Sequence, residues 1–137
     1  MKFPEGIKVY GDKAYRDKKC PKEVMEQVTF FNQLRGRHPE TYGAIAVHVR
    51  NEGKKTVNQV AKEKAEGMVT GACDIMIPGV RTFICELKRR DHTESKIQKE
   101  QIDYMLAAQR LGAFVCIALG WEAAMEAFEE WASSTTN

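Results

Sequence analysis

The sequence predicts a mixed α/β domain, in which a mixed β-sheet is flanked by helices in the order α-β-β-β-α-β. Residues 74–88 contain two apolar segments joined by a Pro-Gly turn, which is typical of an antiparallel hairpin. Residues 95–111 have helical spacing of apolar side chains, and the continuous apolar run 113–119 that follows suits a buried strand. A length of 137 residues fits one domain with a full hydrophobic core.

The N-terminal part of the chain is predicted to be an arm followed by the first helix. Residues 1–20 are polar and contain glycine, so we expect a loosely packed arm before a single domain at 21–137. Pro21 suits a first helical position, and the helix that it opens is expected to end near Gly36. The expected core-facing positions of this helix are Val24, Gln27, Val28, Phe31 and Leu34.

The remaining elements alternate between strands and helices. The predicted strands are 44–50, 74–77, 82–88 and 113–119, and the predicted helices are 56–66, 95–111 and 121–131. Because a helix joins 82–88 to 113–119, these two strands are expected to be parallel. The last helix should have an acidic outer face formed by Glu122, Glu126, Glu129 and Glu130.

The hairpin contains charged residues at positions where burial would be costly. Its turn places Asp74 opposite Glu86 or one position away, and strand alternation puts Ile84, Glu86 and Lys88 on one face. A buried carboxylate costs several kcal/mol unless it is compensated. A divalent cation bound by both carboxylates would compensate it, and Mg²⁺ prefers this kind of oxygen ligand. A buried ion pair at a sheet edge is the alternative interpretation.

Polar residues also interrupt the apolar stripes of two helices. Gln101 lies within the stripe of the helix 95–111, and Gln27 lies within the stripe of the first helix. Glu23 lies one turn before Gln27, whereas Glu26 is expected to point away from the core. Polar side chains on two helices and on the hairpin together favour a functional site.

Together these residues resemble a known nuclease signature. The pattern D-x(11)-E-x-K at Asp74, Glu86 and Lys88 is similar to the PD-(D/E)xK motif, and specifically to the VRR-Nuc family. Further matching segments are E-x-x-x-Q at 23–27, H-V-R-N-E-G at 48–53, T-G-A-C-D at 70–74 and Q-x-x-Y at 101–104. The resemblance covers residues 21 to 128 and implies a restriction-endonuclease-like core.

The resemblance implies a Mg²⁺- or Mn²⁺-dependent phosphodiesterase. The metal ligands would be Asp74, Glu86 and the backbone carbonyl of Leu87, and Glu23 would hold a metal-bound water. Lys88 would position or activate the attacking water, and Gln101 would orient the lysine or the water. Stand-alone phage and bacterial members of this kind resemble small homodimers that cut branched DNA such as four-way (Holliday) junctions.

The sequence departs from the family pattern at two positions, and two assignments stay open. Cys73 stands where the family usually has proline, and Gln98 stands where a serine commonly precedes the glutamine. Gln98 is therefore an alternative to Gln101. Glu26 is similarly an alternative to Glu23, and its outward direction makes it second choice.

Basic residues cluster at 48–55, at 88–90 and at Lys96 and Lys99, although the formal net charge is only +2. If the clusters bind a polyanion, the expected DNA contacts are Arg50, Lys54, Lys55, Arg89, Arg90, Lys96 and Lys99. A structure-selective endonuclease is the leading hypothesis. The alternatives are an inactive DNA-binding module of the same fold, a sequence-specific restriction-type nuclease, or a structural domain with buried ion pairs.

The sequence also carries expectations about other sites and about location. The four cysteines have no CxxC spacing, which argues against a zinc site. The sequence has no apolar run of membrane-spanning length and no apolar core of a signal peptide near residue 1, so we expect a cytoplasmic protein with no membrane contact.

Overall fold

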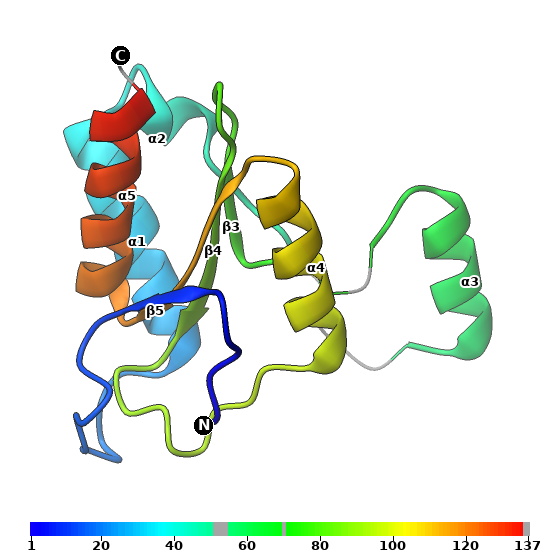
Figure 1. Cartoon of the computed structure of the whole chain (residues 1–137), viewed down its shortest axis with the longest axis horizontal. Coiled ribbons are helices and arrows are strands. Elements are labelled where there is room, and N and C mark those ends of the chain that lie inside the picture. Colours follow the sequence, from blue (N-terminus) through cyan, green and yellow to red (C-terminus); the bar gives the residue numbers. More distant parts are fainter. Residues whose placement is uncertain (51–54, 70, 136–137) are drawn as a thin grey trace.

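The structure, a computed structural model, describes residues 1–50, 55–69 and 71–135, and has a β-sheet between two layers of helices (Figure 1). The strands are β1 (Lys8–Tyr10), β2 (Val47–His48), β3 (Ile75–Ile77), β4 (Phe83–Lys88) and β5 (Phe114–Leu119). The helices are α1 (Glu23–Arg37), α2 (Tyr42–Ile45), α3 (Val57–Ala65), α4 (Lys99–Arg110) and α5 (Trp121–Thr135).

The sheet is mixed, as predicted. Its strand order is β1-β5-β4-β3-β2. The β1–β5 and β5–β4 pairs are parallel, whereas β3 pairs antiparallel with both β4 and β2. Helices α1 and α5 lie on one side of the sheet and α4 on the other (Figure 1). The order α1-β2-β3-β4-α4-β5 reproduces the predicted α-β-β-β-α-β core, so the expected restriction-endonuclease-like fold class is confirmed.

Strand β4 separates two hydrophobic cores. Phe83, Cys85 and Leu87 face the larger core, which they form with side chains from α1 and α5. Ile84 faces the smaller core, where it packs with Met105 of α4 and Ile117 of β5. The predicted alternation along this strand is therefore confirmed. Its even-numbered residues continue toward the α4 side as Glu86 and Lys88, both buried.

Two secondary-structure predictions for the first 50 residues are wrong. Residues Lys8–Tyr10, expected within a loosely packed arm, form the edge strand β1, and Ile7 and Tyr10 are buried. The predicted strand 44–50 is replaced by the short helix α2 and by β2, which has only two residues. Gly43 allows this helix to approach α1, because an added Cβ would lie 2.5 Å from the His38 carbonyl oxygen.

The buried face of α1 also differs from the predicted stripe. Phe31 and Leu34 are buried as expected, but Val24 and Val28 are 62% and 46% exposed. Phe30 and Glu26 are buried instead. The helix is rotated relative to the expectation because its core-facing side packs against α5.

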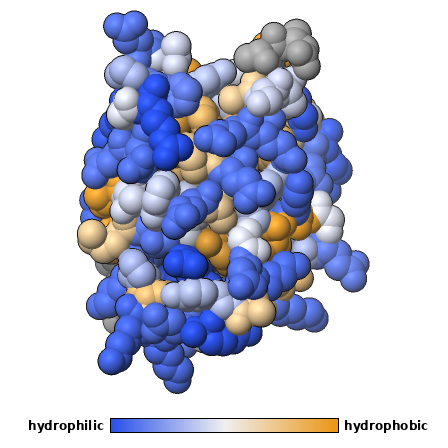
Figure 2. Space-filling model, turned by 90° about the vertical axis from the view of Figure 1, so that its left-hand side faces the viewer, coloured by the Kyte–Doolittle hydropathy of each residue, from blue (hydrophilic) through white to orange (hydrophobic). Residues whose placement is uncertain are grey.

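Helix α4 begins at Lys99, four residues later than predicted, and α3 lies away from the sheet (Figure 1). The predicted helix 56–66 is present as α3, which begins after a Thr56 capping box and has no buried residue. Figure 2 shows the side of the molecule that α5 and α1 cover, where hydrophilic side chains dominate. Over the described ranges, no helix combines the length and apolar character needed to cross a bilayer.

Candidate active site

Three carboxylates from separate segments of the chain converge in the structure. Glu23 lies in the first turn of α1, Asp74 directly precedes β3, and Glu86 lies within β4. One oxygen atom from each lies within 4.8 Å of the others, and this acidic cluster is the one group of metal-ligating side chains found among the described residues. Side chains far apart in the sequence thus form a single potential cation site.

The hairpin register places the two central carboxylates as the sequence predicted. Ile75 pairs with Cys85, which puts Asp74 opposite Glu86. The backbone N–H of Leu87 donates a 2.9 Å hydrogen bond to Oδ2 of Asp74. Asp74 is therefore fixed against β4 by the main chain.

Glu86 is the most buried carboxylate of the cluster. Its residue is only 1% exposed, and burial raises the pKa of its carboxyl well above the ordinary value. Hydrogen bonding and repulsion from Asp74 raise this pKa further, and Glu23 adds to the repulsion. The charge of Lys88 opposes the rise. In the absence of a cation, the cluster is therefore unfavourable for three ionised carboxylates.

Gln101 is the glutamine that reaches the cluster. Its Nε2 donates a 2.8 Å hydrogen bond to Oε2 of Glu86, and its Oε1 accepts a 2.8 Å bond from the N–H of Gln98. Gln98 is the N-cap residue of α4. Gln101, which is hydrogen-bonded to Glu86, is therefore favoured over Gln98, which is the N-cap residue.

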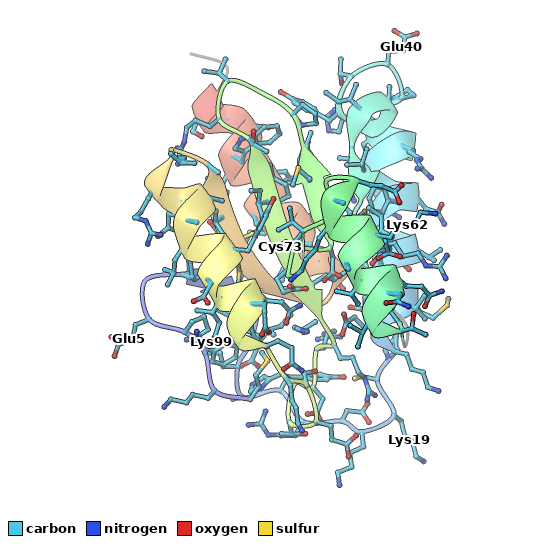
Figure 3. All side chains as sticks on the ribbon, turned by 90° about the vertical axis from the view of Figure 1, so that its right-hand side faces the viewer. Glu5, Lys19, Glu40, Lys62, Cys73 and Lys99 are labelled. Atoms are coloured by element: carbon cyan, nitrogen blue, oxygen red, sulfur yellow. The ribbon has the colours of Figure 1, made fainter. Side chains whose placement is uncertain are left out.

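A close backbone contact holds the start of α4 against the segment before Asp74. Gly71 has a positive φ of 90°, and a Cβ at this position would lie 2.4 Å from the carbonyl oxygen of Glu100 and 2.8 Å from the N of Gln101. Only glycine allows this approach without strain. Figure 3 looks onto this side, where Cys73 lies between α4 and α3.

The structure also places Glu23 and Glu26 in different environments. Glu26 is 3% exposed, and its Oε2 accepts a 2.9 Å hydrogen bond from the N–H of Trp121, the first residue of α5. Burial raises the pKa of Glu26, and the bond from Trp121 opposes this rise. The expectation that Glu26 points away is wrong, because it stabilises the start of another helix. Glu23 is the glutamate in the acidic cluster.

One residue beside the cluster was quoted in a motif but given no role by the sequence. Nδ1 of His48 donates a 2.8 Å hydrogen bond to the carbonyl oxygen of Asp74, since a carbonyl oxygen can only accept. His48 lies in β2, whose pairing with β3 brings it to this position. The sequence signal for this contact was a histidine in a predicted strand close to Asp74 in the sheet, since His48 pairs with Ile75, the residue after Asp74.

The predicted DNA contacts are distributed over several regions. Arg50 lines a cavity beside Glu23, whereas Lys55 forms an ion pair with Glu63. Lys96 is exposed before α4, and Lys99 lies 3.5 Å from Asp103 in an exposed pair. Lys54 lies outside the described residues.

The two arginines after β4 do not join the acidic cluster. The Arg89 guanidinium donates hydrogen bonds to the main-chain carbonyl oxygens of Lys18, Cys20 and Pro21. The Arg90 guanidinium lies over the ring of Tyr15 with a separation of 4.2 Å. Arg89 thus fixes the N-terminal segment against the end of β4.

The donor set of the cluster fits a hard divalent cation. Carboxylate oxygens are the ligands that Mg²⁺ and Mn²⁺ prefer, and the raised pKa of Glu86 marks a site that a bound cation would relieve. The three sulfur atoms nearby do not compete, because Cys73, Cys85 and Cys116 are buried and burial raises the pKa of the Cys73 thiol.

Comparison with solved structures identifies the fold. The chain superposes on a structure described as a "VRR_NUC domain protein" with a TM-score of 0.69, over 84% of this chain and 91% of that chain, at 16% sequence identity. No protein-family model and no curated protein matches the chain. The structural likeness confirms the fold that the sequence resemblance implied.

Proposed function

We propose that this protein is a VRR-Nuc nuclease, a Mg²⁺- or Mn²⁺-dependent endonuclease that hydrolyses phosphodiester bonds in branched DNA such as four-way junctions. The observation that carries the proposal is the convergence of Glu23, Asp74 and Glu86 within 4.8 Å on the fold of a VRR_NUC domain. Three carboxylates this close together, with Glu86 buried and Glu23 and Asp74 half-buried, repel one another and are hard to explain without a bound cation.

Asp74, Glu86 and the carbonyl of Leu87 would hold the metal, and Glu23 would hold it through a water. The N–H and C=O of one strand residue point toward the same neighbouring strand, so the Leu87 carbonyl faces the side on which its N–H contacts Asp74. When bound, the ion supplies Lewis-acid polarisation of a phosphoryl oxygen and lowers the pKa of a water.

Lys88 and Gln101 would orient the reacting groups. Lys88 shares the face of Glu86 and is 7% exposed, so its ammonium can hold the attacking water and offset negative charge that develops on the phosphate. Gln101 fixes the Oε2 of Glu86 through its amide and so keeps that carboxylate in one orientation. Neither residue needs to touch the metal for these roles.

The substrate and assembly follow from the same proposal. Arg50, Lys96 and Lys99 offer exposed positive charge for the phosphate backbone, which favours binding by DNA shape over sequence. Cutting both strands of a junction requires two active sites, so we propose a homodimer. An enzyme with this substrate would work in the cytoplasm.

The test compares wild-type protein with Asp74→Asn on labelled duplex, flap and four-way junction substrates in Mg²⁺ or Mn²⁺. Wild type should cleave the junction preferentially, and the variant should be inactive while still binding the same DNA. Asp103→Asn, an exposed aspartate on α4, is the matched control and should cleave normally. An equally active Asp74→Asn protein would refute the assigned site.

Two alternative functions have distinct outcomes in the same assay. An inactive DNA-binding module would bind junctions with steep salt dependence and cleave none of the substrates with either metal. A restriction-type nuclease would cut duplexes at one sequence, irrespective of branching. Analytical ultracentrifugation with and without junction DNA would test the homodimer.

A further inference from the structure

A cavity of about 620 Å³ adjoins the acidic cluster and shares Glu23 with it. Its lining residues are Lys22, Glu23, Val24, Gln27, His48 and Arg50. We refer to it as the α1–β2 pocket. Glu23 belongs both to this pocket and to the acidic cluster. A ligand in the pocket would therefore be separated from the candidate metal site only by the Glu23 side chain.

The pocket walls come from two separate segments that the fold brings together. Lys22 and Gln27 lie at the start of α1, and Arg50 lies two residues beyond the end of β2. His48 connects the second wall to the cluster, because its Nδ1 donates to the carbonyl oxygen of Asp74 at 2.8 Å. The position of the pocket relative to Asp74 is therefore fixed by a hydrogen bond.

The chemistry of the lining favours an anion with several oxygen atoms. Lys22 and Arg50 supply two positive charges, and Gln27 supplies an amide donor at helical spacing from Glu23. The one carboxylate in the pocket, Glu23, belongs to the acidic cluster, where a divalent cation would compensate its charge. Lysine and arginine with amide donors are the groups that bind phosphate oxygens in proteins.

We propose that the α1–β2 pocket binds the substrate phosphate that neighbours the one being cleaved. The inference rests on the proposed nuclease function and adds a second anchor point to it. One phosphate would lie at the acidic cluster and the adjacent one between Lys22, Gln27 and Arg50. Two phosphates fixed along one DNA strand define the path and the direction of that strand across the site. A single metal-bound phosphate would fix neither.

This role predicts a contact that depends on backbone charge and not on base sequence. A methylphosphonate replaces one charged phosphate oxygen by a methyl group and removes the negative charge at a single position. If the pocket holds one specific phosphate, methylphosphonate at that position should weaken both binding and cleavage, with little effect of the neighbouring bases.

The experiment scans single methylphosphonates on both sides of the mapped cleavage site of a junction. Binding is measured by fluorescence anisotropy with Ca²⁺ in place of Mg²⁺, so that a divalent cation still compensates the charge of Glu23, and cleavage is measured separately with Mg²⁺. For wild type we expect one adjacent position at which affinity falls roughly tenfold, the loss expected for a charged hydrogen bond. For Lys22→Gln/Arg50→Gln, affinity for unmodified DNA should fall similarly, and the methylphosphonate should have no further effect.

Arg37→Gln is the control, because Arg37 lies at the opposite end of α1 and is paired with Glu129. It should retain wild-type sensitivity to the methylphosphonate. The proposal is overturned if no adjacent position is sensitive in wild type, or if the double variant keeps full sensitivity. Failure of the nuclease function has a different signature, namely no cleavage with any metal. In that case a binding scan of every phosphate along the junction, compared between wild type and the double variant, decides whether the pocket holds a phosphate.

Discussion

The amide nitrogen of Gln101 donates a 2.8 Å hydrogen bond to Oε2 of Glu86 and so joins the first turn of α4 to the centre of β4. Glu86 is almost fully buried and repelled by Asp74, so this neutral donor is one of the few groups that stabilise its ionised form. The contact explains a glutamine on the sheet-facing side of an otherwise apolar helix surface.

Gln101→Leu should lower the cleavage rate by about tenfold or more, because Glu86 loses the donor that orients it. It should also weaken metal binding, which is measured as a smaller metal-induced rise in melting temperature. Gln109→Leu on the same helix removes a hydrogen bond to the Gly6 carbonyl and is the control. Equal loss of activity in both variants would mean that Gln101 acts only through helix stability.

Glu86→Gln should make the metal-free protein more stable at neutral and alkaline pH. The native carboxyl has a pKa raised above its usual 4.5, so the native state binds a proton more tightly than the unfolded state. The free energy of unfolding of wild type therefore falls as pH rises from 4.5 through the raised pKa, and the glutamine variant should lack this slope.

The measurement for Glu86→Gln is urea unfolding in EDTA over a series of pH values from the ordinary carboxyl pKa of 4.5 upward, because the linkage begins there. Glu40→Gln, at an exposed glutamate, should unfold with the wild-type pH dependence. A variant that is less stable than wild type throughout this range would show that the Glu86 carboxylate is structurally required. Added Mg²⁺ should stabilise wild type and not Glu86→Gln.

Lys88→Met should reduce single-turnover cleavage by about two orders of magnitude or more, because methionine has neither a donor to hold the attacking water nor a positive charge to offset the charge that develops on the phosphate. Metal affinity should be retained, since removal of a positive charge beside Asp74 and Glu86 does not oppose cation binding. The two quantities are compared by metal titration and rapid-quench kinetics. Lys62→Met on α3 is the control, and wild-type cleavage by Lys88→Met would leave Lys88 as an ion-pair partner only.

Glu23→Gln and Glu26→Ala should have opposite effects. Loss of Glu23 from the acidic cluster should abolish efficient metal-dependent cleavage with little change in stability. Glu26→Ala leaves the buried N–H of Trp121 without its acceptor and should cost about 1–3 kcal/mol of stability. Thermal denaturation and cleavage at a temperature where both variants are folded would separate the two roles, and an inactive but stable Glu26→Ala would reverse the assignment.

Gly71→Ala should impair folding and cleavage more than Gly67→Ala does. Both glycines have positive φ, 90° and 101°, but an added Cβ meets the backbone of α4 only at Gly71. The difference between the two variants therefore isolates the close approach from the general cost of a left-handed conformation, which is about 1 kcal/mol or more. Chemical denaturation and cleavage assays of the pair measure it, and equal destabilisation would argue against this contact.

Much of the acidic cluster could be predicted from local sequence. Residues on one strand alternate between faces, so Glu86 and Lys88 had to share a side. A short hairpin turn limits the register, so Asp74 had to lie close to Glu86. These relationships depend on neighbours within about a dozen residues, which is why the hairpin was predicted correctly before any tertiary contact was known.

Errors arose where a residue's environment depends on distant segments. Strand β1 has only three residues, and its pairing with β5 involves residues more than 100 positions away. The inward direction of Glu26 depends on the N-terminus of α5, and the role of Arg89 depends on three carbonyl groups of the N-terminal segment. Periodicity within one helix cannot report which of its faces another helix will cover.

The sequence by itself determined the α/β class, the core element order and the carboxylate and lysine pair of β4, because these follow from strand and helix periods and from a local turn. Tertiary structure alone separated Glu23 from Glu26 and Gln101 from Gln98, and it alone showed that Glu26 caps α5 and that His48 contacts Asp74. The physical reason is that a hydrogen bond between two elements depends on their relative placement, which is set by packing of the whole core.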